Sequence, residues 1–172
     1  MQKRIGQVTP GTKPELAEIE ARILKERGQI SGLYRTLLNS PDIANGWETL
    51  FTAVRNRSTL NPALREMMIL RVAVINKADY EFQAHIIPAT KAGIAAEKIE
   101  AIKNPDLSPA FSELERAMIK LTDTMTKDIY VPDELFSQIK PHFNDRELLE
   151  LITTISAYNM VSRLLIALQV HN

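Results

Sequence analysis

The sequence contains no cysteine among its 172 residues. Disulfides, thiolate metal sites and thiol peroxidase chemistry all require a cysteine sulfur, so each of them is excluded. The chain also lacks an excess of either charge, because 21 Lys and Arg residues balance 21 Asp and Glu residues. That balance gives no electrostatic footprint for nucleic acid, and we expect no nucleic-acid partner. An acidic small molecule remains a candidate ligand, since a few local arginines suffice to bind one.

Long apolar runs are missing as well. The N-terminal MQKRIGQVTPGTKP lacks the apolar stretch of a signal peptide. The longest apolar run covers residues 67–75 and is interrupted by Arg71, so it is too short for a bilayer span of about 20 residues. We therefore expect a cytoplasmic protein that has no membrane partner.

What the sequence does contain is typical of a soluble globular domain, with 45% apolar and 24% charged residues. Helix signals dominate, and the few β-branched stretches lie inside longer helical patterns, so the predicted fold class is all-α. Gly28 is a C-terminal stop, Asn61 is an N-cap followed by proline, and Asp79 is an expected N-cap. Helices are expected at residues 14–27, 33–38, 40–57, 61–75, 79–93, 95–103, 112–127, 132–140 and 145–170.

Two helix boundaries stay open. No Gly or Pro separates the helices on either side of residues 76–78, so one long helix is an alternative there. The last helix is long and has a cluster of Ser, Tyr and Asn at 156–159, where a break is an alternative. We expect one domain over residues 1–172, made of an N-terminal helical extension (1–60), a core motif (61–104) and a second helical half (108–172).

The two halves contain a weak internal repeat. Arg-Glu opens an apolar run at residue 65 and again at residue 146, and each run reaches a tyrosine followed by a polar residue at 80–81 and 158–159. Chance similarity between two amphipathic helices explains this pattern equally well.

Glu81 and His85 are the first candidates for chemistry. They lie four residues apart, so on a helix they share one face and can touch. A carboxylate beside an imidazole fixes the ring tautomer and stabilises the protonated form, which makes a general acid–base pair. A routine surface pair has the same spacing.

Charged residues inside the apolar run are the next candidates. Glu66 shares a helical face with apolar residues, so its carboxylate is either buried and paired or close enough to the helix start to reach solvent. Arg71 and Arg163 can each bind a substrate carboxylate or form a structural salt bridge. Pro88, three residues after His85, removes a backbone donor and can kink the helix beside it.

Metal and cofactor motifs are absent from the sequence. His85, Glu81 and Glu66 offer ligand atoms, but there is no HExxH and no paired ExxH. Gly-rich phosphate loops and GxSxG elbows are also missing. We therefore expect neither a metal nor an organic cofactor.

At these residues the chain resembles a known family. The string LREMMILRVAVINKADYEFQAHIIPATKAGIAAEKIEAI, residues 64–102, is similar to the core of the carboxymuconolactone decarboxylase family. The likeness combines Arg-Glu before an aliphatic run, Tyr-Glu, a His four residues later and an alanine-rich stretch that ends in Gly. It implies an alkylhydroperoxidase D-like helical bundle that forms a homo-oligomer, a trimer or a hexamer.

The two branches of this superfamily imply different chemistry. The alkylhydroperoxidase D branch uses a Glu, a CxxC pair and a His, and its cysteine positions correspond here to Ala78 and Glu81. The decarboxylase branch needs no thiol. It implies that His85 transfers a proton with help from Glu81 and Glu66, while Arg71, Arg65 and Tyr80 bind the substrate.

The resemblance leaves the substrate open. True decarboxylases are usually shorter than this chain, and its first forty residues look more like those of uncharacterised relatives. We expect a decarboxylase-like lyase that performs acid–base chemistry on a small carboxylated substrate or a lactone. A non-catalytic ligand-binding or assembly protein on the same scaffold is the alternative.

Overall fold

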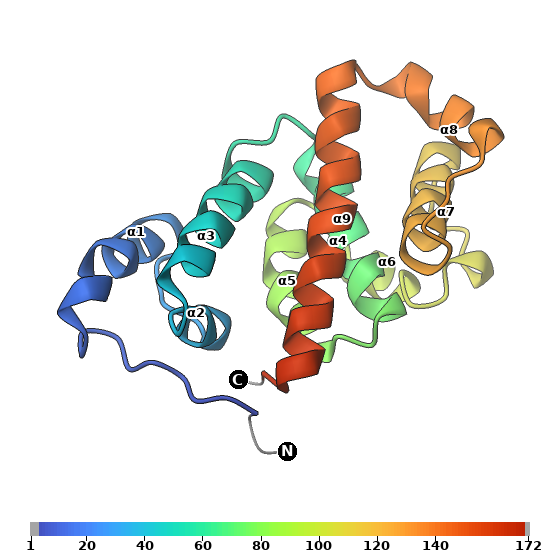
Figure 1. The fold of residues 1–172 in the computed structure, drawn as a ribbon. Coiled ribbons are helices and arrows are strands. Elements are labelled where there is room, and N and C mark those ends of the chain that lie inside the picture. Colours follow the sequence, from blue (N-terminus) through green and yellow to red (C-terminus); the bar gives the residue numbers. More distant parts are fainter. Residues whose placement is uncertain (1–3, 171–172) are drawn as a thin grey trace. The chain divides into compact units, whose positions relative to one another are not determined.

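A computed structural model describes residues 4–170, and within them every regular element is helical, which confirms the all-α prediction (Figure 1). The α-helices are α1 (Ala17–Arg27), α2 (Gly32–Leu37), α3 (Pro41–Asn56), α4 (Pro62–Ile75), α5 (Asp79–Lys91), α6 (Ala96–Ala101), α7 (Glu113–Lys127), α8 (Asp133–Ile139) and α9 (Asp145–Leu168). Short 3-10 turns lie at η1 (Pro14–Leu16), η2 (Pro105–Leu107) and η3 (Lys140–His142).

Local sequence signals set most helix ends. Gly28 ends α1 in the left-handed conformation at φ 75°. The Asn61 side chain accepts hydrogen bonds from the first backbone N–H groups of α4, as its N-cap role predicts. Ser112 and Glu115 form a reciprocal capping box at the start of α7. The predicted cap at Asp79 is wrong, because Ala78 is the N-cap and Asp79 is already the first residue of α5.

Of the two open helix boundaries, the one at residues 76–78 separates two helices, whereas the helix through residues 156–159 is unbroken. Lys77 adopts φ 56°, a left-handed conformation that no helix interior allows, so α4 and α5 are separate helices. The Ala78 N–H donates to the Ala73 carbonyl at 2.8 Å and thereby closes this short turn. α9 continues without interruption from Asp145 to Leu168. Pro88 lies inside α5, which still extends to Lys91.

The described residues form two compact units. The N-terminal unit contains α1 to α3 and the chain from Leu164 onward, and the main unit covers Ser58–Arg163. In the N-terminal unit, Trp47 stacks on Phe51 with ring centroids 4.7 Å apart. The backbone N–H of Arg4 donates to the Leu168 carbonyl and so connects both ends of the chain within this unit.

The main unit is organised around α4. Its aliphatic residues from Met67 to Ala73 are almost entirely buried, and the helix packs against α5 and α7. The apolar run is therefore core within a single chain. α9 is long and apolar enough to cross a membrane by length and composition alone, and half of its apolar stretch is buried inside the protein.

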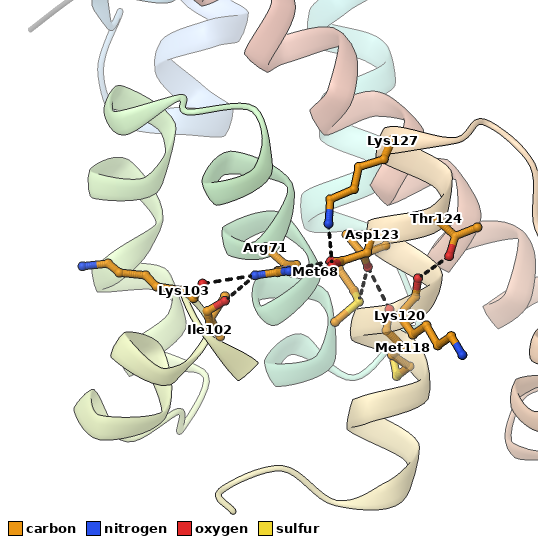
Figure 2. Close-up of polar contacts among 10 residues, drawn as sticks. Met68, Arg71, Ile102, Lys103, Met118, Lys120, Asp123, Thr124 and Lys127 are labelled. Carbon is orange, nitrogen blue, oxygen red and sulfur yellow. Dashed lines mark hydrogen bonds and ion pairs between the residues drawn. The ribbon is translucent and has the colours of Figure 1, made fainter. Parts of the chain in front are cut away.

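Arg71 connects three helices of the main unit (Figure 2). Its guanidinium donates to both carboxylate oxygens of Asp123 on α7, at 2.6 and 2.5 Å, and to the Ile102 carbonyl beyond α6 at 2.9 Å. Burial would raise the pKa of Asp123, but hydrogen bonds from Arg71 and Lys127 lower it below its usual range. This bidentate pair keeps the guanidinium neutralised in the core.

Glu150 on α9 connects that helix to the residues that lead into α4. Its Oε2 accepts from the Thr59 N–H at 2.7 Å, the Thr59 hydroxyl at 2.8 Å, the Ser58 hydroxyl at 2.9 Å and the Leu60 N–H at 3.1 Å. Burial opposes ionisation here, but the bonds from Arg146, Thr59 and Ser58 outweigh it and lower the pKa of Glu150 to about 2. The carboxylate thus fixes the start of the helix that carries Glu66.

We expect Glu150→Gln to destabilise the protein by about 1–2 kcal/mol at pH 7, because a neutral amide cannot accept the same set of bonds. The folded-state pKa of about 2 lies below the ordinary value of 4.5, so the stabilisation is complete above pH 4.5 and is lost as pH falls towards 2. Urea unfolding at pH 7 and pH 3 measures both effects. The exposed Glu134→Gln serves as control, and an equal deficit at both pH values would contradict the prediction.

Arg71→Met should cost about 2–3 kcal/mol, because it leaves Asp123 and the Ile102 carbonyl without their partner. Lys127 pairs with the same carboxylate, but its side chain is 52% exposed. Lys127→Ala should therefore cost less than about 1 kcal/mol. Thermal or urea unfolding of the two variants gives the comparison, and similar losses for both would show that the Arg71 bonds are worth no more than a surface pair.

Candidate active site

Glu66, Glu81 and His85 come together in the main unit. Glu66 lies in the second turn of α4, whereas Glu81 and His85 lie one turn apart on α5. The His85 Nδ1 is 2.6 Å from Glu66 Oε2, and its Nε2 is 3.0 Å from Glu81 Oε1. One imidazole is therefore held between two carboxylates, one on each ring nitrogen. We call these three residues the Glu–His–Glu cluster.

The cluster lies in the interior. Glu66, Glu81 and His85 expose only 3%, 6% and 2% of their surface, which excludes both the routine surface pair and a Glu66 that reaches solvent. Arg65 provides a second cation, with its Nε 3.8 Å from Glu66 Oε1. That nitrogen is buried and has no hydrogen-bond partner among the described residues. Two acids and two bases thus balance each other in a small volume.

The geometry determines where His85 can hold protons. A neutral imidazole donates through only one nitrogen, so its other nitrogen would face a carboxylate lone pair. Protonated His85 donates to both neighbours. Burial alone would lower the pKa of His85, but the hydrogen bonds and charges of Glu66 and Glu81 outweigh it and raise the pKa above 6.5. His85 therefore keeps its proton at a pH where a free histidine would lose it.

This arrangement can move a proton along a line of three groups. Glu81 is the most exposed member, with 8% of its side chain accessible against 4% for Glu66 and 2% for His85. It is consequently the end of the line that a substrate could meet. Within residues 4–170, no group of three or more His, Asp or Glu side chains is placed to hold a metal ion.

Tyr158 on α9 is a neighbour of the cluster that the sequence did not single out as a site residue. Its ring meets His85 edge-on, with centroids 5.0 Å apart and an interplanar angle of 87°. The only sequence signal was its place in the weak repeat. That repeat does not create a second cluster, because Glu147 caps α9 through reciprocal bonds with Asn144.

The other predicted substrate-binding residues are placed differently. Arg65 adjoins the cluster, and Tyr80 lies half-buried in the first turn of α5. Arg71 is engaged by Asp123 and the Ile102 carbonyl (Figure 2). Arg163 donates to the side chain of Asn159 at 2.7 Å, one turn earlier on its own helix. Both arginines therefore have structural partners within the protein, as expected if they do not bind substrate.

The N-terminal unit has a separate polar centre and a groove. Buried Glu48 accepts from Tyr34 and Thr52 and pairs with Arg27 at 3.3 Å. Burial, followed by the bond to Glu48, raises the pKa of Tyr34 far above its usual range. A groove of about 750 Å³ lies between α1 and α3, and its lining includes none of Glu66, Glu81 or His85.

Comparison with known proteins gives a family match and several structural relatives. The sequence model of the carboxymuconolactone decarboxylase family matches residues 41–124, a range that contains the whole cluster. An uncharacterized protein of Bacillus subtilis (strain 168) is 25% identical over 114 residues, which cover 65% of this chain and 78% of that protein.

Solved structures share the fold. The alkylhydroperoxidase D core of an uncharacterized peroxidase-related protein from Ralstonia eutropha JMP134 superposes with a TM-score of 0.83 at 16% identity, covering 98% of this chain and 91% of that chain. A debrominase with a cysteine replaced by alanine, in complex with 2,3,4-tribromopyrrole, gives a TM-score of 0.81 at 16% identity, covering 99% and 92%.

A protein of unknown function from Agrobacterium tumefaciens gives a TM-score of 0.74 at 23% identity, covering 80% of this chain and 94% of that chain. At these identities the structural likeness establishes the fold alone. The family likeness comes from the sequence match to residues 41–124. Together, these findings describe a cysteine-free chain that matches the carboxymuconolactone decarboxylase family over residues 41–124 and has the alkylhydroperoxidase D-like fold.

Proposed function

We propose that this protein is a cofactor-free enzyme that performs acid–base chemistry, by decarboxylation or lactone chemistry, on a small carboxylated substrate. The observation that carries the proposal is the buried imidazole held between two carboxylates at 2.6 and 3.0 Å. A buried histidine whose pKa is raised by neighbouring carboxylates is typical of sites that transfer protons. The family match supports an enzyme, since members of this fold include a debrominase.

In the proposed reaction the substrate lies against Glu81, the most exposed end of the cluster. When the bond to the carboxylate breaks, CO₂ leaves and the electron pair stays on carbon, where a neighbouring carbonyl delocalises it. His85 then supplies a proton through Glu81 to that carbon, and the cluster regains a proton from solvent. Glu66 holds the opposite ring nitrogen and stabilises the imidazolium, as a carboxylate behind a catalytic histidine does in other enzymes.

Arg65 is the cation that fits the substrate carboxylate. It lies 3.8 Å from Glu66 and keeps a buried Nε without a hydrogen-bond partner in the described part of the chain. Arg71 is fully engaged by Asp123, so binding a substrate would require it to leave a bidentate pair. Thiol peroxidase chemistry, which the names of several relatives suggest, has no thiol available here.

A non-catalytic role on the same scaffold is the second candidate. The observation that favours it is the burial of the cluster, of which Glu81 exposes 6% and His85 only 2%. An occluded ion cluster can serve a ligand-binding or assembly protein as a structural element. The two candidates differ in whether the proton on His85 reaches a substrate.

His85→Gln and Glu81→Gln should each lower kcat/KM by about 100-fold or more, because each removes one step of the proton relay. Turnover of a panel of lactones and β-keto acids is measured by CO₂ release and by loss of the lactone. The matched control is His142→Gln, which alters an exposed histidine of η3. Activity should decline as pH rises through the raised pKa of His85, since the acid form is then lost.

Two outcomes would contradict the catalytic proposal. If the folded wild-type protein turns over no member of the panel, the non-catalytic alternative stands. If His85→Gln remains as active as His142→Gln, the reaction does not use the cluster.

We further propose that the protein works as a homo-oligomer, a trimer or a hexamer, in the cytoplasm. Support comes from large apolar side chains that the single chain leaves exposed, above all Ile129 at 85% and Tyr130 at 67%. Ile129 also adopts φ 63°, an unusual conformation for a β-branched residue. Light scattering coupled to gel filtration should give a mass of three or six chains, and a monomer over a range of concentrations would refute the proposal.

A further inference from the structure

Tyr158 and Asn159 are neighbouring residues of α9. One contacts the His85 ring, and the other contacts the turn between α4 and α5. Tyr158 is 1% exposed and Asn159 is 8% exposed. The Tyr158 ring meets the ring of His85. The Asn159 side chain reaches Asn76, at the end of α4. Because α9 is continuous, the helix backbone sets the spacing between these two contacts.

The Asn159 amide uses its full hydrogen-bonding capacity. Its Nδ2 donates to the Thr126 hydroxyl at 3.0 Å and to the Ile155 carbonyl at 3.1 Å. Its Oδ1 accepts from Asn76 at 3.0 Å and from Arg163 at 2.7 Å. Arginine has no acceptor, so the atom facing Arg163 must be the oxygen and the amide has one orientation. A buried group satisfied in all four directions resists movement.

Asn76 occupies the position on which the cluster depends. It is the C-cap of α4, and only Lys77 and Ala78 separate it from α5. Lys77 has to adopt a left-handed conformation for the chain to turn there, which is unfavourable for a residue with a side chain. The turn determines how α5 lies on α4, and therefore how His85 meets Glu66. The bond from Asn159 holds this turn from a third helix.

Tyr158 acts on the imidazole itself. The nearly perpendicular contact at 5.0 Å places one ring against the other and leaves His85 little freedom to rotate. Rotation would break both short bonds at once, because Nδ1 and Nε2 point to different carboxylates. A ring fixed from the side keeps both bonds aligned.

We infer that Tyr158 and Asn159 are positioning residues for the proton relay: Tyr158 fixes the orientation of the His85 ring, and Asn159 fixes the α4–α5 turn through Asn76. Their role in a reaction rests on the proposed function. Their effect on the His85 geometry does not depend on it.

The charged and titratable groups facing His85 come from three helices. Glu66, with Arg65 beside it, lies on α4, Glu81 lies on α5 and Tyr158 lies on α9. Burial lowers the pKa of His85, and the two carboxylates raise it. Loosening the geometry lengthens the bonds that raise the pKa and admits water, so the pKa falls towards its ordinary value.

The test is an NMR titration of the imidazole ¹⁵N signals in the full-length, labelled protein. His85→Gln identifies the His85 signals among those of the three histidines. Tyr158→Leu and Asn159→Leu should each lower the apparent pKa of His85 by about one unit. Tyr158→Phe keeps the ring contact with His85, so its His85 pKa should stay closer to the wild-type value than that of Tyr158→Leu. If Tyr158 were purely structural, its replacement would lower the stability of the protein, but the His85 pKa would not differ between Tyr158→Phe and Tyr158→Leu.

Further variants keep the test decisive if Asn159→Leu does not fold. Asn76→Ala removes only the bond to the turn and should shift the His85 pKa in the same direction. Ser156→Ala alters an exposed position of α9 and should leave the titration unchanged.

The inference is overturned if folded Tyr158→Leu and Asn76→Ala titrate like wild type while Glu66→Gln does not. A protein without turnover in any assay would defeat the proposed function and leave this result standing, because the titration does not require a substrate.

Discussion

The placement of one imidazole between two carboxylates in an apolar interior is the constraint on which the main unit depends. Charged groups lose their hydration when they are buried, and only close pairing compensates for that loss. Glu66 and His85 approach to 2.6 Å, a contact that small movements of α4 against α5 would destroy. The rest of the unit can be understood from this requirement. Glu150 holds the start of α4, Arg71 anchors its middle, and Asn159 holds its end.

The residue at position 81 changes what this scaffold can do. By the resemblance to the alkylhydroperoxidase D branch, this position corresponds to one cysteine of a CxxC pair, with the histidine four residues later. Here a carboxylate faces the same histidine at 3.0 Å. A carboxylate accepts and releases protons but has no redox chemistry of its own. With Glu66 on the other ring nitrogen, the cluster is a line of three titratable groups without a thiol.

The sequence correctly predicts those features that depend on residues close together in the chain. The helix boundaries at Gly28, Asn61 and Ser112 follow from capping chemistry that acts within a few residues. The Glu81–His85 contact follows from helical spacing. The Asp79 cap was wrong because α5 begins one residue earlier than predicted: Ala78, which has no capping side chain, is the N-cap, and its carbonyl accepts from the Glu81 N–H.

The remaining features depend on contacts between distant parts of the chain. Glu66 and His85 are 19 residues apart, and Lys77, rather than a glycine, makes the turn that joins their helices. Nothing in the local sequence marks a lysine as left-handed. The Arg71–Asp123 pair spans 52 residues, so the choice between a substrate-binding and a structural arginine could not be made from spacing.

The energetics of the cluster favour a function over a purely structural role. A buried ion pair is a weak means of stabilisation, because apolar residues of similar volume often stabilise a core as well or better, by about 1–4 kcal/mol. From Met67 to Ala73, α4 already buries an apolar side chain at every position except Arg71, so the apolar packing of this helix comes from residues other than Glu66. Two acids and two bases in this volume, in contact with a satisfied amide network and an aromatic ring, therefore support the proposed proton transfer.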